Sequence, residues 1–129
     1  MAALTPIHQI DGCDIAVGEH YLRGVVGPGL AEPVQECYRR LAYECVQRRY
    51  ARVLVIGKST YDAFYHLAGR DALRSMAIAG LPADFRIAFV ATTPSLIAVY
   101  DAAVREAERL GLDARRFTDE NEAERWLVQ

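Results

Sequence analysis

One short segment carries the residue types of a phosphate-binding loop. RVLVIGKST, residues 52–60, ends in Gly57-Lys58-Ser59, and Lys58 is the only lysine in the chain. A P-loop has a glycine five positions before that final glycine, and backbone N–H groups in between wrap the phosphates. Here position 52 is an arginine and residues 53–56 are an apolar run typical of a strand. We therefore predict a strand that ends at Gly57, with Lys58 in solvent, rather than a P-loop.

A second glycine pattern lies upstream. In GVVGPG the glycines at 24, 27 and 29 have the spacing GxxGxG, whereas dinucleotide-binding folds use GxGxxG. No acidic residue follows at the end of the next strand, where a ribose partner is expected. We interpret the segment as a turn made by Gly27, Pro28 and Gly29, with a dinucleotide site as the less favoured alternative.

The histidines do not form a catalytic or metal-binding pattern. His8, His20 and His66 are scattered without metal-ligand spacing, and no serine lies in a GxSxG elbow. His66 follows a tyrosine on a predicted helix, so we expect a partly exposed helix residue rather than a base. Phospho-receiver domains have acidic strand ends, but these strands end in Gly57-Lys58 and Ala91-Thr92. We predict no catalytic residue, no metal and no cofactor.

Hydroxyl side chains follow two of the predicted strands. In an open parallel sheet, ligands bind beyond the carboxyl ends of the strands, and helix N-termini there attract anions. The candidates for a ligand or switch site are Lys58, Ser59, Thr60, Thr92, Thr93 and Ser95. The alternative is that these hydroxyls only cap helices, with Ser59 or Thr60 capping one and Thr93, before Pro94, capping the next.

Basic and aromatic residues also alternate along the first long helix. On a helical wheel, Tyr43 lies opposite the Cys37–Leu41 face and close to Arg39 and Gln47. Arg39 and Tyr43 are therefore candidates for a partner-binding surface. The alternative is a solvated helix face on which the arginine stems lie flat.

Strand-like and helix-like segments alternate along the chain. The predicted strands are residues 8–10, 14–17, 20–26, 52–57, 85–91 and 113–117; the predicted helices are residues 31–49, 60–79, 94–110 and a short segment capped by Thr118 or Asp119. Gly69 is a possible break in the second helix. This order predicts a single α/β domain, residues 1–129, with a mainly parallel sheet, helices packed on it and an N-terminal antiparallel hairpin edge turning at Gly18-Glu19.

The charge and the cysteine content limit which partners and which cellular compartment we expect. The net charge of −2 over 129 residues gives no general attraction to nucleic acid or to anionic membranes. The N-terminus has no signal-peptide pattern, and the longest apolar stretch is too short to insert in a membrane. Cys13, Cys37 and Cys45 form no CxxC pair and leave one unpaired, which favours a reducing cytoplasm.

The second and third cysteines lie on an apolar helix face. Val34, Cys37, Leu41 and Cys45 recur at steps of three and four, so this face should pack on the sheet. We expect both cysteines in the core, with a redox or ligand role as the alternative.

The C-terminal third resembles a known family. RIAFVATTPSLIAVYDAAVREAERLGLDARRFTDENEAERWL is similar to the end of the SpoIIAA-like, or STAS/SEC14-like, bacterial proteins. The matching residues are Phe117, Asp119, Glu120, Ala123, Trp126 and Leu127. YLRGVVGPGL before the first long helix and ARVLVIG after it also fit in order. The resemblance implies a STAS-like fold in which Phe117, Trp126 and Leu127 anchor the last helix on the sheet.

The resemblance also implies a class of function. STAS domains act as binding or switch modules, and in sporulation-type members a partner kinase phosphorylates a serine that starts a helix. Ser59 is the nearest match in position, although GKST differs from their Asp-Ser-x-Gly motif. SEC14-type relatives carry lipids, but this chain is short for a large lipid pocket.

Two function classes follow from these observations. The first is a non-enzymatic regulatory or protein-interaction module with an unknown protein partner. The alternative is a small-molecule binding or carrier protein that holds an anionic or amphipathic ligand at the carboxyl ends of the strands. An enzyme is less favoured, because no nucleophile is placed beside a base. The exposed Tyr43 and the hairpin edge also allow a homodimer.

Overall fold

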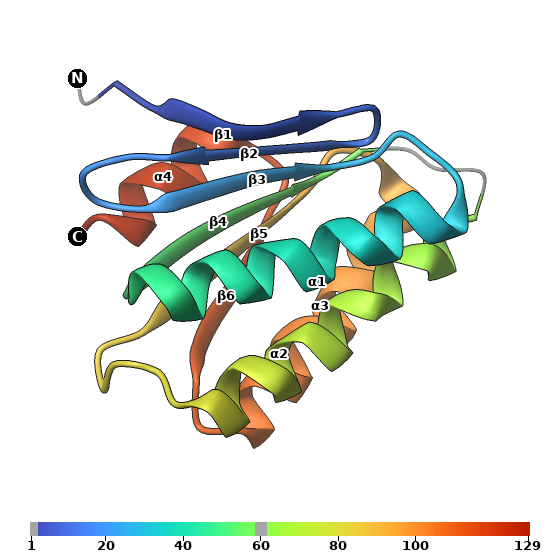
Figure 1. Ribbon diagram of the computed structural model, residues 1–129. Helices are drawn as coiled ribbons and strands as arrows, with labels where there is room; N and C mark the ends of the chain where they lie inside the picture. Colours follow the sequence, from blue (N-terminus) through green and yellow to red (C-terminus); the bar gives the residue numbers. More distant parts are fainter. Residues whose placement is uncertain (1–2, 59–61) are drawn as a thin grey trace.

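The computed structural model describes residues 3–58 and 62–129, which form a six-stranded sheet with helices on both faces (Figure 1). The strands are β1 (Thr5–Ile10), β2 (Cys13–Val17), β3 (Leu22–Val26), β4 (Arg52–Gly57), β5 (Arg86–Ala91) and β6 (Asp113–Phe117). The helices are α1 (Ala31–Arg48), the 3-10 helix η1 (Ala63–Leu67), α2 (Ala68–Ala79), α3 (Pro94–Arg109) and α4 (Glu120–Leu127).

The strands lie in the sheet in the order in which they occur in the chain. β1, β2 and β3 are antiparallel neighbours, whereas β3, β4, β5 and β6 are parallel. The α/β class and the antiparallel N-terminal edge predicted from the sequence are confirmed, and the hairpin through Gly18 and Glu19 joins β2 to β3. A second hairpin, through Asp11 and Gly12, adds β1 at the edge of a mixed sheet.

The three connections between β3, β4, β5 and β6 each join neighbouring parallel strands. The helices in these connections all lie on the same face of the sheet. Figure 1 shows α1, α2 and α3 side by side on that face, with α4 on the opposite face. β4 and β5 are therefore covered on both sides, which explains why their sequences are nearly continuous apolar runs. The larger core lies under α1, α2 and α3, and a smaller one lies under α4.

The helix predicted over residues 60–79 differs from the observed structure. Asp62 is the N-cap of η1, and its carboxylate accepts a hydrogen bond from the backbone N–H of Phe64 at 2.9 Å. α2 begins only at Ala68, so the chain changes helix type just before Gly69. Gly69 itself is buried in α2 against the Tyr38 ring. The predicted caps Ser59 and Thr60 lie outside the described residues.

Cys37 and Cys45 are buried as predicted, and Cys13 is buried as well. Cys13 of β2 and Cys37 of α1 form a disulfide with a Cα–Cα distance of 5.4 Å. No local spacing predicted this pair, which forms because β2 passes directly under α1. Cys45 is free, and burial raises the pKa of its thiol to about 12.

The C-terminal packing predicted from the sequence is confirmed. The Asp119 carboxylate caps α4 by accepting a hydrogen bond from the backbone N–H of Asn121 at 2.7 Å. Trp126 and Leu127 are buried against the sheet, and the Phe117 and Trp126 rings lie 5.7 Å apart. Within the described parts of the chain, no helix is both long and apolar enough to cross a membrane.

Candidate functional site

Two regions combine side chains that sequence analysis treated separately. The first, which we call the tyrosine–histidine cluster, consists of Tyr38, His66 and Tyr100. They come from α1, η1 and α3, and they meet beneath the carboxyl end of β4. Their exposed fractions are 2%, 1% and 0%. Three polar side chains are thus sealed inside the larger core.

The direction of each hydrogen bond in the cluster follows from chemistry. His66 Nε2 lies 3.1 Å from the carbonyl oxygen of Lys58, which can only accept, so Nε2 carries the proton. The other ring nitrogen, Nδ1, must then accept a hydrogen bond from the Tyr38 hydroxyl, 2.6 Å away. The Tyr38 oxygen in turn accepts from the Tyr100 hydroxyl, also at 2.6 Å.

Burial keeps all three groups of the cluster neutral. It lowers the pKa of His66 to about 4, because the charged imidazolium would lose its hydration. Burial also raises the pKa values of Tyr38 and Tyr100 well above that of free tyrosine. The cluster therefore links two helices to the loop after β4 without carrying charge at neutral pH.

Gly57 is required by the same cluster. A Cβ atom at position 57 would collide with the hydroxyl and ring of Tyr100, which lie against the end of β4. The glycine of the Gly57-Lys58 pair is thus explained by close packing and not by a phosphate. Val53–Ile56 lie within β4, as predicted, and cannot form a phosphate-wrapping loop.

The expectation for His66 was wrong. It was predicted to be a partly exposed helix residue, but η1 turns its ring into the core. One sequence signal pointed the other way: Tyr100 lies on the apolar face of its helix, and a buried tyrosine hydroxyl needs a partner. A histidine on a neighbouring element can be that partner.

The loops at the carboxyl ends of β4 and β5 come together as predicted, since Gly57 pairs with Ala91. The Thr92 hydroxyl donates to the Gly57 carbonyl at 2.6 Å, and the hydroxyls of Thr93 and Ser95 lie 3.2 Å apart. Thr93 occupies the N-cap position of α3, but its side chain makes no capping hydrogen bond.

The basic member of these loops is exposed. The Lys58 side chain lies in solvent, as expected, while its backbone N–H donates to the Val26 carbonyl at 2.8 Å. Ser59 and Thr60, the remaining predicted residues, lie outside the described residues. An anion site at these loops remains a prediction.

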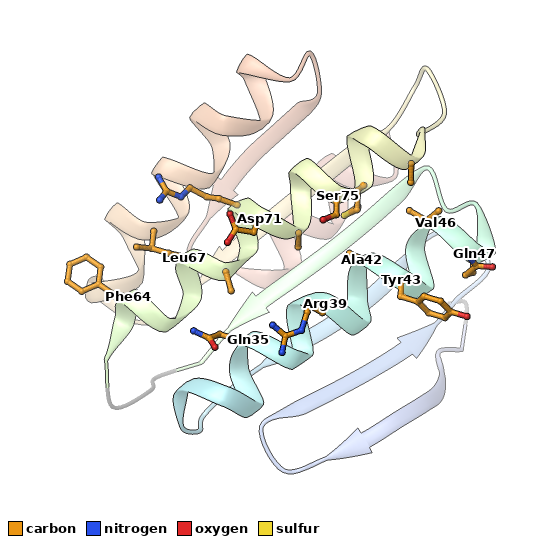
Figure 2. A pocket seen from close by; sticks show the side chains of 15 residues that line it. Gln35, Arg39, Ala42, Tyr43, Val46, Gln47, Phe64, Leu67, Asp71 and Ser75 are labelled. Atoms are coloured by element: carbon orange, nitrogen blue, oxygen red, sulfur yellow. The ribbon is translucent and has the colours of Figure 1, made fainter.

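The second region is a groove of about 770 Å³ between α1 and α2, which we call the α1–α2 groove (Figure 2). Its floor consists of the small or apolar residues Ala42, Val46, Ala68, Ala72 and Met76. Its walls consist of Gln35, Arg39, Tyr43 and Gln47 on α1, and Arg70, Asp71, Ser75 and Ala79 on α2, with Phe64 and Leu67 of η1 at one end. Both walls thus contain residues that recur every four positions along a helix.

Two large side chains of the groove are uncovered. Tyr43 is 58% exposed and Phe64 is 69% exposed. The predicted outward position of Tyr43, beside Arg39 and Gln47, is confirmed. Sequence analysis missed the α2 wall, because no local pattern shows which helices are neighbours.

Charges in the groove are only partly compensated. Arg39 pairs with Glu36 at 2.6 Å, and Asp71 pairs with Arg74 at 3.2 Å. The side chain of Arg70 has no ion-pair or hydrogen-bond partner among residues 3–58 and 62–129. The groove therefore keeps an uncompensated positive charge.

The described residues contain no group of histidine, cysteine and acidic side chains that could hold a metal ion. Comparison of the chain with protein-family models, with curated proteins and with solved structures finds no match.

Proposed function

We propose that this chain is a non-enzymatic protein-interaction module of STAS-like fold whose partner docks in the α1–α2 groove. The observation that carries the proposal is the exposure of Tyr43 and Phe64 beside the groove. Exposed aromatic residues around a hollow are typical of interaction surfaces, and tyrosine is enriched among residues that dominate binding energy.

The buried polar groups of the core, unlike the exposed groove residues, all have partners within the protein, which supports a binding role over a catalytic one. Every buried polar side-chain atom within the described residues has a hydrogen-bond partner. The one buried histidine is neutral and is bonded at both ring nitrogens. A general base needs a free nitrogen within reach of a substrate, and His66 offers none in this arrangement.

The STAS-like part of the proposal rests on the C-terminal segment. The packing of Phe117, Trp126 and Leu127 against the sheet is the packing that the resemblance implies. A cytoplasmic location, in contrast, has evidence against it. Disulfides such as Cys13–Cys37 are rare in reducing compartments, so this pair favours an oxidising compartment.

Native mass spectrometry of the protein purified from its own cells tests the interaction proposal. We expect wild type to retain a protein partner and the double variant Tyr43→Ala/Phe64→Ala to lose it. Ile78→Ala is the matched control, because Ile78 is 88% exposed on α2 but does not line the groove. Full retention of the partner by the double variant would contradict the proposal.

Two other outcomes of the same measurement have definite meanings. A bound small molecule instead of a protein would favour the alternative, a carrier of an anionic or amphipathic ligand. A mass of two chains that collapses to one in the double variant would identify the partner as a second copy.

A further inference from the structure

The occupant of the α1–α2 groove can be specified by shape and charge. We infer that it is an amphipathic helix of a partner protein, about three turns long, with an apolar stripe and acidic residues towards both ends. This inference rests on the interaction module proposed above and names the chemistry of its partner.

The shape of the groove fits the side of a helix. Its α1 wall extends from Gln35 to Gln47, and the opposite wall extends from Leu67 of η1 to Ala79 of α2. Each of these spans corresponds to about 18 Å along a helix. Residues four apart form the ridges against which a further helix packs. The alanines in the floor allow its apolar stripe to approach closely.

The groove also has a continuation at one end. A second hollow of about 430 Å³ shares Val46 and Ala79 with it and includes Arg49, Leu81 and Pro82. The surface is therefore an elongated trough along α1 rather than a single deep cavity. An extended occupant uses this surface more fully than a compact metabolite does.

Uncompensated charge lies near both ends of the trough. α1 and α2 both connect successive parallel strands, so they run in the same direction (Figure 1). Arg70 is in the first turn of α2, whereas Arg49 follows the last turn of α1, so the two arginines are near opposite ends. Neither side chain has an ion-pair or hydrogen-bond partner in the described part of the chain.

The neighbouring arginines on α1 all have acidic partners, with Glu44 shared between Arg40 and Arg48. On α1, Arg48 pairs with Glu44 at 2.8 Å and Arg39 pairs with Glu36. The remaining positive charges at Arg49 and Arg70 are complementary to acidic residues about 12 positions apart on a helix. A basic helix would face unfavourable charges at both ends.

Polar residues along the walls favour a peptide over a lipid chain. Gln35 and Gln47 on one wall and Ser75 on the other accompany the apolar floor over its length. A helix presents polar side chains on both flanks of its apolar stripe, and these reach such amides and hydroxyls. An acyl chain has no groups along its length that could form hydrogen bonds with these side chains.

Selection from a displayed library of helical peptides of about 15 residues tests the inference directly. We expect the selected peptides to have apolar residues at i, i+4 and i+7, with acidic residues near both ends. Fluorescence anisotropy should then show at least about tenfold weaker binding to Tyr43→Ala and to Arg70→Glu. Circular dichroism and melting temperature establish that both variants fold.

Matched controls separate charge from position. Arg105→Glu makes the same change in net charge on α3, outside the trough, and should leave affinity within about twofold of wild type. Ile78→Ala should also bind as wild type does. Arg70→Glu should gain affinity for a peptide whose acidic residues at the Arg70 end are replaced by lysine.

Several results would overturn the inference. They are selection of basic or uncharged peptides, equal binding to Arg70→Glu and Arg105→Glu, and recovery of no peptide while oleate binds the groove. If native mass spectrometry still shows a protein partner that needs Tyr43 and Phe64, the interaction module stands and only the acidic helix is wrong.

Discussion

The tyrosine–histidine cluster and the α1–α2 groove use the same helices in opposite ways. Tyr38 of α1 is buried and bonded to His66, whereas Tyr43 of the same helix is exposed beside α2. Every polar group of the cluster is satisfied within the protein, so the cluster holds the structure together. The groove combines exposed aromatic rings with Arg70, which has no charged partner among the described residues, and both features are typical of a surface that binds another molecule.

Replacing the central histidine should have the largest effect on stability. In His66→Leu, the Tyr38 hydroxyl loses its acceptor inside the core and the Lys58 carbonyl loses its donor. We expect a loss of about 3 kcal/mol in the free energy of unfolding, measured by urea denaturation. A loss below about 1 kcal/mol would mean that the cluster contributes no more to the free energy of unfolding than the groove residues do.

The same histidine should make stability depend on pH. Its pKa is about 4 in the folded protein, below the ordinary histidine value of 6.5, because burial disfavours the charged ring. As pH falls, the unfolded chain therefore takes up this proton before the folded protein does. The stabilising effect is complete above pH 6.5. As pH falls towards the folded-state pKa of about 4, approximately 3 kcal/mol should be lost.

The variant His66→Gln provides the reference for that titration. Carboxylates contribute to acid destabilisation in both proteins, so the difference between wild type and variant isolates the histidine. Parallel curves for the two proteins between pH 6.5 and 4 would show that the ring is not buried in its neutral form.

Replacing Tyr38 should destabilise the protein more than replacing Tyr100. Tyr38 makes hydrogen bonds to both other members of the cluster, whereas Tyr100 bonds only to Tyr38. Tyr38→Phe removes the donor to His66 and the acceptor of Tyr100, so we expect about 2 kcal/mol of destabilisation. Tyr100→Phe removes only a donor and should cost about 1 kcal/mol. Thermal unfolding of both variants measures the order, and the reverse order would contradict the assigned hydrogen-bond direction.

Groove substitutions should have the smallest effect on stability. Tyr43→Ala and Phe64→Ala remove exposed side chains, so each should change the free energy of unfolding by no more than about 0.5 kcal/mol. Urea denaturation checks this alongside the cluster variants. A cost above about 1.5 kcal/mol would place these rings in the folded core instead of on a binding surface.

Local patterns predicted much of the fold. The apolar run before Gly57 is a strand, the Asp119 cap begins α4, and the steps of three and four from Val34 to Cys45 form the buried face of α1. Each of these features depends on neighbours within one or two turns. The N-terminal hairpin was predicted for the same reason.

The features that were missed depend on distant parts of the chain. Cys13 and Cys37 are separated by 24 residues and pair only because the hairpin lies under α1. His66 turns inward because η1 replaces the first turn of the expected helix and because Tyr38 supplies a partner. The groove exists only where α1 and α2 are neighbours, so a helical wheel found Tyr43 but not the opposite wall.

Site-specific photo-crosslinking in the protein's own cells tests the central claim most directly. A photoreactive amino acid placed at position 43 or 64 should form a crosslink to one protein partner, while the same group at position 78 should not. Both test positions and the control are exposed, so differences in labelling report position and not access. Equal crosslinking at all three positions, or none at 43 and 64, would contradict the account.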